Sequence, residues 1–185
     1  MQGLNRLILK DNVALMVLLE LWSTRQRVLV ANTHIHWDPS FSDVKLVQTK
    51  MFLEKLAELR RAERLPLLVC GDFNSLPDSG VYALVTGGSL SRDHRDLRSH
   101  SYGAYSRDGM RHDLALVSCY PPEATPYTNC THDFRGVLDY IFVSAESVRV
   151  ASILSVVPPE QLPCPALPNA HSPSDHVLLY ASVFV

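Results

Sequence analysis

An α/β sandwich is the fold class that the sequence predicts, and three observations support it. About six strand-like apolar segments are interspersed with one long and one short helical segment. Strand-like segments lie near both ends of the chain, and the connections include a hairpin as well as strand–helix steps. The chain has no G-x-G-x-x-G segment and no Walker loop, which argues against a doubly wound nucleotide-binding sheet.

The first third of the chain predicts a hairpin followed by a long helix. Residues 13–21 (VALMVLLEL) and 27–33 (RVLVANT) are strand-like, and the polar residues between them predict an antiparallel turn. Asp43 is expected to be the N-cap of a helix over residues 44–65, whose apolar positions recur near helical spacing. The chain is thus expected to open in a strand-like region with an unprotected edge, which suggests a preceding segment.

Strands dominate the rest of the prediction. The apolar run 65–74 (LPLLVCGDFN) predicts a buried strand, and a turn after it leads into a short helix over 81–87. Residues 86–136 are expected to be mostly irregular, and the proline-rich residues 158–173 are expected to form an extended loop. The remaining strands are expected at residues 137–144, 148–156 and 177–185.

The composition fits one globular domain with no membrane partner. The 185 residues are 46% hydrophobic and 19% charged, which allows a sizeable core. The formal net charge of −2 argues against a broad basic surface that grips duplex nucleic acid, but it allows a small cleft that holds a few nucleotides. The four cysteines form no C-x-x-C pair and predict a reducing compartment. No segment resembles a signal peptide or a membrane span.

Polar side chains cluster at the ends of four predicted strands. The clusters are residues 32–39 (NTHIHWDP), 71–74 (GDFN), 139–140 (DY) and 174–176 (SDH). Asp72 and Asn74 alternate with Phe73, so in an extended segment both side chains would project to one face. Asp139 lies inside an apolar strand, where an unpaired carboxylate would cost several kcal/mol, so we expect a histidine partner for it.

Each of these residues also has a structural interpretation when it is taken alone. Asp72 at a strand end is the kind of residue that forms turns, and a lone His34 is commonly a satisfied surface or core residue. Trp37 is expected in the core, and Asp96 is expected to be a solvated loop charge. The joint occurrence of carboxylate, amide and imidazole groups at the strand ends of one sheet nevertheless favours an active site. Oxygen ligands without zinc spacing predict Mg²⁺ and metal-assisted phosphodiester hydrolysis.

The order of these motifs resembles that of a known superfamily. Asn-Thr-His, Gly-Asp-Phe-Asn, Asp-Tyr-Ile and Ser-Asp-His follow one another as in the endonuclease/exonuclease/phosphatase superfamily. Four longer segments resemble the catalytic subunit of the carbon-catabolite-repression-type deadenylase complex built on the NOT scaffold: residues 34–48, 72–82, 127–142 and 172–176. Angel-type proteins, nocturnin and the 2′,5′-phosphodiesterase share the core motifs and remain alternatives.

The resemblance implies catalytic roles for five residues. Asp72 and Asn74 match the pair that orients the attacking water and binds the phosphate. His176 matches the histidine that contacts the scissile phosphate, and Asp139 matches its carboxylate partner. His34 matches an additional histidine that contacts the phosphate.

Binding roles are implied for a second group of residues. Asp175 matches a further metal-side or orienting carboxylate, and the implied cofactor is Mg²⁺, with Mn²⁺ as a substitute. Pro39 and Phe134 match positions that clamp an adenine base, and Asn74 matches a contact to the same nucleotide. The implied partners are the 3′ end of poly(A) RNA and other subunits of a deadenylase complex, in the cytoplasm and also in the nucleus.

The departures from the family concern the first half of its domain. The family's glutamate metal ligand belongs to that half, as does an asparagine, and residues 1–185 contain neither; they also lack a leucine-rich repeat. The chain is therefore expected to be the C-terminal half of a four-layer, deoxyribonuclease I-like α/β sandwich with a mixed, mainly antiparallel sheet. The expected function is Mg²⁺-dependent 3′-to-5′ removal of poly(A) tails, with weak or no activity by this chain alone. Another phosphodiesterase or phosphatase of the superfamily, or a non-catalytic fragment, is the alternative.

Overall fold

A five-stranded mixed sheet forms the centre of the fold. The computed structural model describes residues 2–158, 161 and 166–185. The strands follow one another in the order β1 (Ala14–Glu20), β2 (Arg27–His34), β3 (Leu67–Asp72), β9 (Asp139–Ser144) and β6 (Leu116–Ser118). β2 and β3 pair in parallel, and the other three pairings are antiparallel. The sheet is therefore mixed and mainly antiparallel, and this part of the predicted fold class is confirmed.

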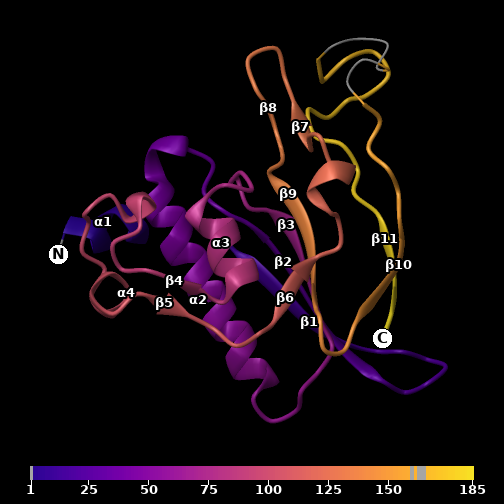
Figure 1. The fold of residues 1–185 in the computed structure, drawn as a ribbon, viewed down its shortest axis with the longest axis horizontal. Helices are drawn as coiled ribbons and strands as arrows, with labels where there is room; N and C mark the ends of the chain where they lie inside the picture. Colours follow the sequence, from indigo (N-terminus) through magenta and orange to yellow (C-terminus); the bar gives the residue numbers. More distant parts are fainter. Residues whose placement is uncertain (1, 159–160, 162–165) are drawn as a thin grey trace.

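Helices cover one face of this sheet (Figure 1). The described helices are α1 (Gln2–Ile8), α2 (Ser42–Arg60), α3 (Gly80–Gly87) and α4 (Ala104–Arg107). Fully buried apolar side chains such as Leu53, Leu84 and Phe142 join α2 and α3 to the strands in one core. None of these described helices is long and apolar enough to cross a membrane.

A two-stranded sheet covers part of the opposite face. β10 (Arg149–Ile153) and β11 (Ala181–Phe184) pair antiparallel and pack against β3 and β9. Among the described residues, none covers β1 on this face, whereas Val28 of β2 is buried. Leu15, Val17 and Leu19 on β1 share that face, and they are 65%, 38% and 49% exposed. Exposed apolar surfaces of this kind are typical of interaction sites.

Short elements connect the two sheets and extend the ends of the long strands. The β7–β8 hairpin projects beyond the end of β9 (Figure 1), and an isolated bridge joins its Asn129 to His176. The bounds of the short strands are β4 (Ser89–Leu90), β5 (Met110–Arg111), β7 (Asn129–Cys130) and β8 (Arg135–Gly136). The 3₁₀ helices are η1 (Pro39–Phe41), η2 (Arg95–Leu97) and η3 (Pro122–Ala124).

Most of the predicted elements are confirmed, with two errors near the N-terminus. The chain opens with the helix α1, not with a strand-like region, and the start of α2 was assigned to the wrong residue. The N-cap of α2 is Phe41, and Asp43 lies inside the first turn with a fully buried side chain. Asp43 accepts two hydrogen bonds from Arg6 at 3.0 and 3.1 Å and one from the Tyr102 hydroxyl at 2.5 Å. Asp43 therefore anchors α1 to α2 and does not cap the helix.

Two segments, residues 86–136 and 158–173, are predicted to be irregular. Residues 86–136 are mostly irregular, but β6 within them joins the main sheet, which the sequence did not predict. Its three residues are too few to show a reliable period of two. Of the loop expected at 158–173, residues 159–160 and 162–165 lie outside the described residues.

One glycine allows β2 and β3 to approach closely beside the candidate site. Gly71 has φ +142°, and a Cβ atom at this position would overlap the carbonyl oxygen of Thr33 on β2. A residue with a side chain would therefore separate the two strands immediately before Asp72.

Candidate active site

Three neighbouring strands bring their polar end residues side by side. The register of the sheet pairs His34 on β2 with Asp72 on β3, and Asp72 with Asp139 on β9. Side chains that are directly paired point to the same face of a sheet. This is the face on which β10 and β11 pack, opposite the helices. Three of the four predicted polar clusters therefore converge at one edge of the fold.

His176 joins this group from the segment that precedes β11. Its Nδ1 atom lies 2.7 Å from Oδ2 of Asp139, and its Nε2 atom lies 3.9 Å from Oδ2 of Asp72. His34 approaches the same Asp72 oxygen, with Nε2 at 3.4 Å. The structure thus supplies the histidine partner that the sequence predicted for Asp139. That hydrogen bond also fixes the orientation of the ring, so that Nε2 faces the other carboxylate.

Burial and neighbouring charges shift the pKa values within this group. Burial raises the pKa of Asp72, the hydrogen bond from the Asn74 backbone opposes this rise, and the Asp139 carboxylate adds to it. Burial alone would lower the pKa of His176, but the hydrogen bond and the charge of Asp139 outweigh it, so that this pKa is raised. The His176 imidazole is therefore shifted toward its charged form, which can bind a phosphate oxygen.

Asn74 is held in a left-handed conformation and does not continue the strand. Its φ is +45°, so the expectation of an extended segment from Asp72 through Asn74 is wrong at this position. Its backbone N–H donates to Oδ1 of Asp72 at 2.8 Å, and its side-chain Nδ2 donates to the carbonyl of Ile35 at 2.9 Å. Its carbonyl accepts a hydrogen bond from Nζ of Lys45 at 2.6 Å. These contacts leave the amide oxygen of Asn74 to orient a water or a substrate group.

A cleft of about 480 Å³ opens beside Asn74. Pro39 and Phe134, the two residues matched to a base clamp, both line it. Phe134 reaches the cleft from the β7–β8 hairpin, and it is 39% exposed. The structure therefore brings together the three residues that the sequence assigned to substrate binding, and Asn74 links their cleft to the carboxylate–histidine group.

Several residues of the cleft were missed or misjudged from the sequence. Trp37 was expected in the core, but it is 68% exposed and lines the cleft. Asp96 was expected to be solvated, but its side chain is 19% exposed and accepts a hydrogen bond from the Gly80 N–H at the start of α3. Lys45 and Arg95 also line the cleft. Lys45 could not be identified from the sequence, because helical spacing alone does not distinguish it from a surface lysine.

The structure does not bring Asp175 into the carboxylate–histidine group. One of its carboxylate oxygens accepts a hydrogen bond from Nδ2 of Asn129 at 3.0 Å, which connects the segment before β11 to β7. Its assignment as a metal-side residue therefore stays a prediction, and the observed role of its side chain is to hold the segment that carries His176.

The donor atoms of the group can hold a divalent metal ion. Ligand atoms of Asp72, Asp139 and His176 all lie within 4.8 Å of one another. Oδ2 of Asp139 is engaged by Nδ1 of His176, and Oδ1 of Asp72 accepts from the Asn74 N–H, which leaves the other oxygen of each carboxylate for a cation. A hard cation such as Mg²⁺ suits a site with two carboxylates, because water and phosphate oxygens can fill its other coordination positions. The residues present therefore fit part of a divalent-metal site.

The fold and the site together define a class of protein. A carboxylate pair that can hold a metal ion, a histidine whose pKa is raised and an adjoining, mainly apolar cleft suit metal-assisted cleavage of phosphate esters. The endonuclease/exonuclease/phosphatase family matches residues 2–176 of the sequence, and the chain belongs to this family.

Curated relatives of the chain include exoribonuclease subunits. The chain is 36% identical to the CCR4-Not complex 3′-5′-exoribonuclease subunit Ccr4 of Mycosarcoma maydis, over 95% of this chain and 30% of that protein. It is 37% identical to the Schizosaccharomyces pombe subunit, over 96% of this chain and 29% of that protein. The expected resemblance to this type of deadenylase subunit is confirmed. The chain spans about 30% of the length of these relatives.

Two solved structures share the fold at appreciable sequence identity. ANGEL2, described as a 2′,3′-cyclic phosphatase, superposes with a TM-score of 0.80 at 27% identity, over 95% of this chain and 62% of that chain. The human nocturnin catalytic domain superposes with a TM-score of 0.67 at 25% identity, over 95% of this chain and 53% of that chain. The expected deoxyribonuclease I-like α/β architecture is thereby confirmed.

Proposed function

We propose that these residues are the part of a 3′-to-5′ exoribonuclease that binds the adenylate end of an RNA and activates its last phosphodiester bond. The observation that carries the proposal is that Asn74 donates to Asp72 of the carboxylate–histidine group and also lines the cleft formed by Pro39 and Phe134. The similarity to Ccr4 subunits over nearly the whole chain supports it.

The chemistry follows from the positions of the side chains. Asp72 and Asp139 would hold Mg²⁺, the proposed cofactor, which would supply neutralisation of charge on the phosphate. Asp72 has a raised pKa and is suited to accept a proton from the attacking water. The amide oxygen of Asn74 would orient that water. The imidazoles of His176 and His34 would donate to phosphate oxygens, while Asp139 raises the pKa of His176 and orients its ring.

Recognition of adenine follows from the shape and polarity of the cleft. Trp37, Pro39 and Phe134 offer flat apolar surfaces, and a purine gains more from stacking on such surfaces than a pyrimidine does. Base–aromatic stacking contributes on the order of 1–3 kcal/mol per base. Polar groups around the same cleft, including Asn74, can then select the edge of the base.

The site is proposed to be completed by a segment outside these residues. The family resemblance places a glutamate metal ligand in the first half of the domain, and residues 1–185 are proposed to be the C-terminal part. The open apolar face formed by Leu15, Val17 and Leu19 is the surface that we expect the remaining strands of the domain to cover. We further propose a deadenylase complex as the assembly, in the cytoplasm and also in the nucleus.

The proposal is tested by shortening of labelled RNA. The longest gene product that contains these residues is expected to shorten a 5′-labelled oligoadenylate from its 3′ end with Mg²⁺, and to act far more slowly on oligocytidylate. Asp72→Asn should abolish the reaction, whereas Trp22→Ala, at the exposed tip of the β1–β2 hairpin, should not. The 185-residue chain alone should show little or no shortening. Equal rates on both oligonucleotides would contradict adenine recognition.

A second candidate is a phosphatase that opens 2′,3′-cyclic phosphates. The observation in its favour is the superposition on ANGEL2, a 2′,3′-cyclic phosphatase. The two candidates are separated by the substrate end: an RNA with a terminal 2′,3′-cyclic phosphate tests the second, and an RNA with a 3′-hydroxyl tests the first. Loss of the cyclic phosphate without shortening would favour the phosphatase.

A further inference from the structure

A second hollow lies on the flank of the molecule next to the candidate cleft. It has a volume of about 430 Å³ and is formed by the segment from Arg92 to Ser106. Its lining includes three arginines and two histidines but a single carboxylate: Arg92, Arg95, Arg98, His94, His100 and Asp93. Several serine hydroxyls complete the wall. The hollow is thus polar and cationic in a chain whose net charge is −2.

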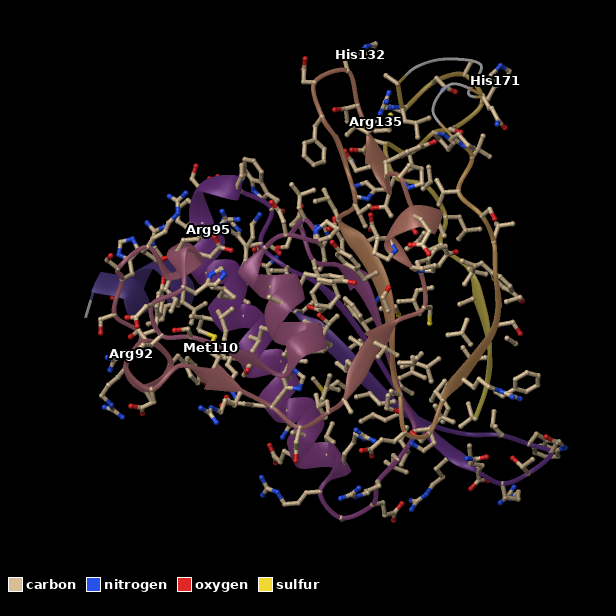
Figure 2. The ribbon with its side chains drawn as sticks, viewed as in Figure 1. Arg92, Arg95, Met110, His132, Arg135 and His171 are labelled. Carbon is tan, nitrogen blue, oxygen red and sulfur yellow. The ribbon has the colours of Figure 1, made fainter. Side chains whose placement is uncertain are left out.

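The hollow adjoins the candidate cleft. Arg95 lines both of them. Arg98 donates from Nε to the hydroxyl of Ser42 at 3.1 Å, and Ser42 lines the cleft. Figure 2 shows Arg95 and Arg92 on the same flank, both on the segment that follows α3. The cleft and the hollow therefore share a wall, and a strand that leaves the cleft past Arg95 would meet the hollow.

Arg92 and Arg95 are only weakly engaged, and the hydrogen bond from Arg95 to the carbonyl of Asp78 is long, at 3.4 Å, and exposed. Arg92 is 3.6 Å from Asp93, and Arg95 is 3.8 Å from Asp96 and 3.9 Å from Asp78. These separations are longer than hydrogen bonds, and the arginine side chains are 65% and 73% exposed, so the pairs contribute little. Asp96 is also committed to the N–H of Gly80. A phosphate group can displace such pairs with shorter, charge-assisted hydrogen bonds.

We propose that the hollow binds the sugar-phosphate backbone of the RNA upstream of the nucleotide held in the cleft. The inference rests on the proposed function, because it assigns the hollow to the same strand. The cleft would select the base, and the hollow would bind phosphates without regard to sequence. The hollow therefore gives affinity that depends on the length of the RNA and on salt.

The experiment compares binding of two labelled ligands with phosphorothioate linkages, which resist cleavage. They are an adenylate dinucleotide, which fills the cleft alone, and an adenylate decanucleotide, which also reaches the hollow. The variant R92Q/R98Q removes two positive charges from the hollow, and R61Q/R64Q, at the exposed end of α2, removes two charges elsewhere. R92K/R98K keeps the charge, and R92Q alone preserves the hydrogen bond between Arg98 and Ser42.

The expected result is a decrease in affinity that is confined to the longer ligand. R92Q/R98Q should bind the decanucleotide roughly tenfold more weakly at low salt, and the slope of log K against log salt should fall by about 0.7 for each phosphate that the variant no longer neutralises. R92K/R98K should retain most of the affinity, R92Q should show part of the decrease, and all variants should bind the dinucleotide as the wild type does.

Two outcomes would overturn parts of the account separately. If R92Q/R98Q and R61Q/R64Q weaken decanucleotide binding equally, or neither does, the hollow is not the backbone site. R92Q alters no residue of the cleft wall, so it provides a test even when the double variant is unstable. If R92Q binds the decanucleotide as the wild type does at every salt concentration, the hollow is again not the backbone site. If the wild type binds neither ligand, the proposed function itself fails.

Discussion

Replacing Asp43 with asparagine distinguishes two roles for this residue, helix N-cap and buried ion-pair partner, because they predict different decreases in the free energy of unfolding. As an N-cap, Asp43 would contribute about 0.5–2 kcal/mol, and asparagine would replace it well. In the structure its side chain is fully buried and accepts hydrogen bonds from Arg6 and Tyr102. Asparagine keeps the shape but leaves the Arg6 guanidinium without its counter-charge.

The expected decrease is about 3 kcal/mol in the free energy of unfolding. Breaking a buried ion pair by removing one partner costs about 3–5 kcal/mol, and the lower end applies because the Arg6 side chain is 27% exposed and regains some hydration. Urea denaturation of the wild type and Asp43→Asn measures this difference. A double-mutant cycle with Arg6→Met isolates the pair. A decrease below about 1 kcal/mol would refute the ion-pair account and restore the capping interpretation.

The same residue gives a pH dependence of known sign. Burial works to raise the pKa of Asp43, but the hydrogen bonds from Arg6 and Tyr102 outweigh it, so the folded pKa is lowered. The stabilisation is therefore fully present above the ordinary carboxyl value of about 3.9 and is lost as pH falls through the lowered folded value. Wild-type stability should fall in this acid range, and Asp43→Asn should show less of the fall.

Three further predictions concern the site itself. Asp139→Asn should lower the pKa of His176, because the ring keeps an acceptor but loses the neighbouring charge; NMR titration measures it, and an unchanged pKa would contradict the account. Phe134→Ala should weaken oligoadenylate binding by about tenfold, within the range expected for the stacking of one base on an aromatic ring; undiminished affinity would remove Phe134 from the base site. Gly71→Ala should cost at least about 2 kcal/mol of stability, since its Cβ would overlap the β2 backbone. Gly87→Ala, whose Cβ would meet nothing within 4 Å, is the matched control in denaturation.

Much of the fold could be predicted because its signals are local. The hairpin of β1 and β2, the long helix and the buried strand β3 each contain enough residues to show their period. The partner of Asp139 was predictable in kind, because a carboxylate within an apolar strand requires one. Its identity as His176 required the chain to return through the segment before β11, with a sequence separation of 37 between the two residues.

The errors arise where tertiary contacts decide the structure. Asp43 has the sequence position of a cap, but Arg6 and Tyr102, distant in the chain, make it a buried partner. The sequence predicts that Asn74 extends the strand. In the structure Asn74 has a left-handed backbone conformation, and in this conformation its carbonyl accepts a hydrogen bond from Lys45. The sequence favours the core for Trp37 because large aromatic residues are usually buried. In the structure its side chain is instead exposed and lines the cleft.

The most direct test of the central claim is to map where an adenylate end binds on this chain. The claim is that the cleft and the carboxylate–histidine group are one site joined at Asn74. NMR of the 185-residue chain with Mg²⁺ and a cleavage-resistant adenylate dinucleotide should shift the signals of Asn74, Phe134 and His176 together, with a single affinity. Shifts at Phe134 without any at His176, or different affinities for the two, would show that the cleft and the catalytic group are separate.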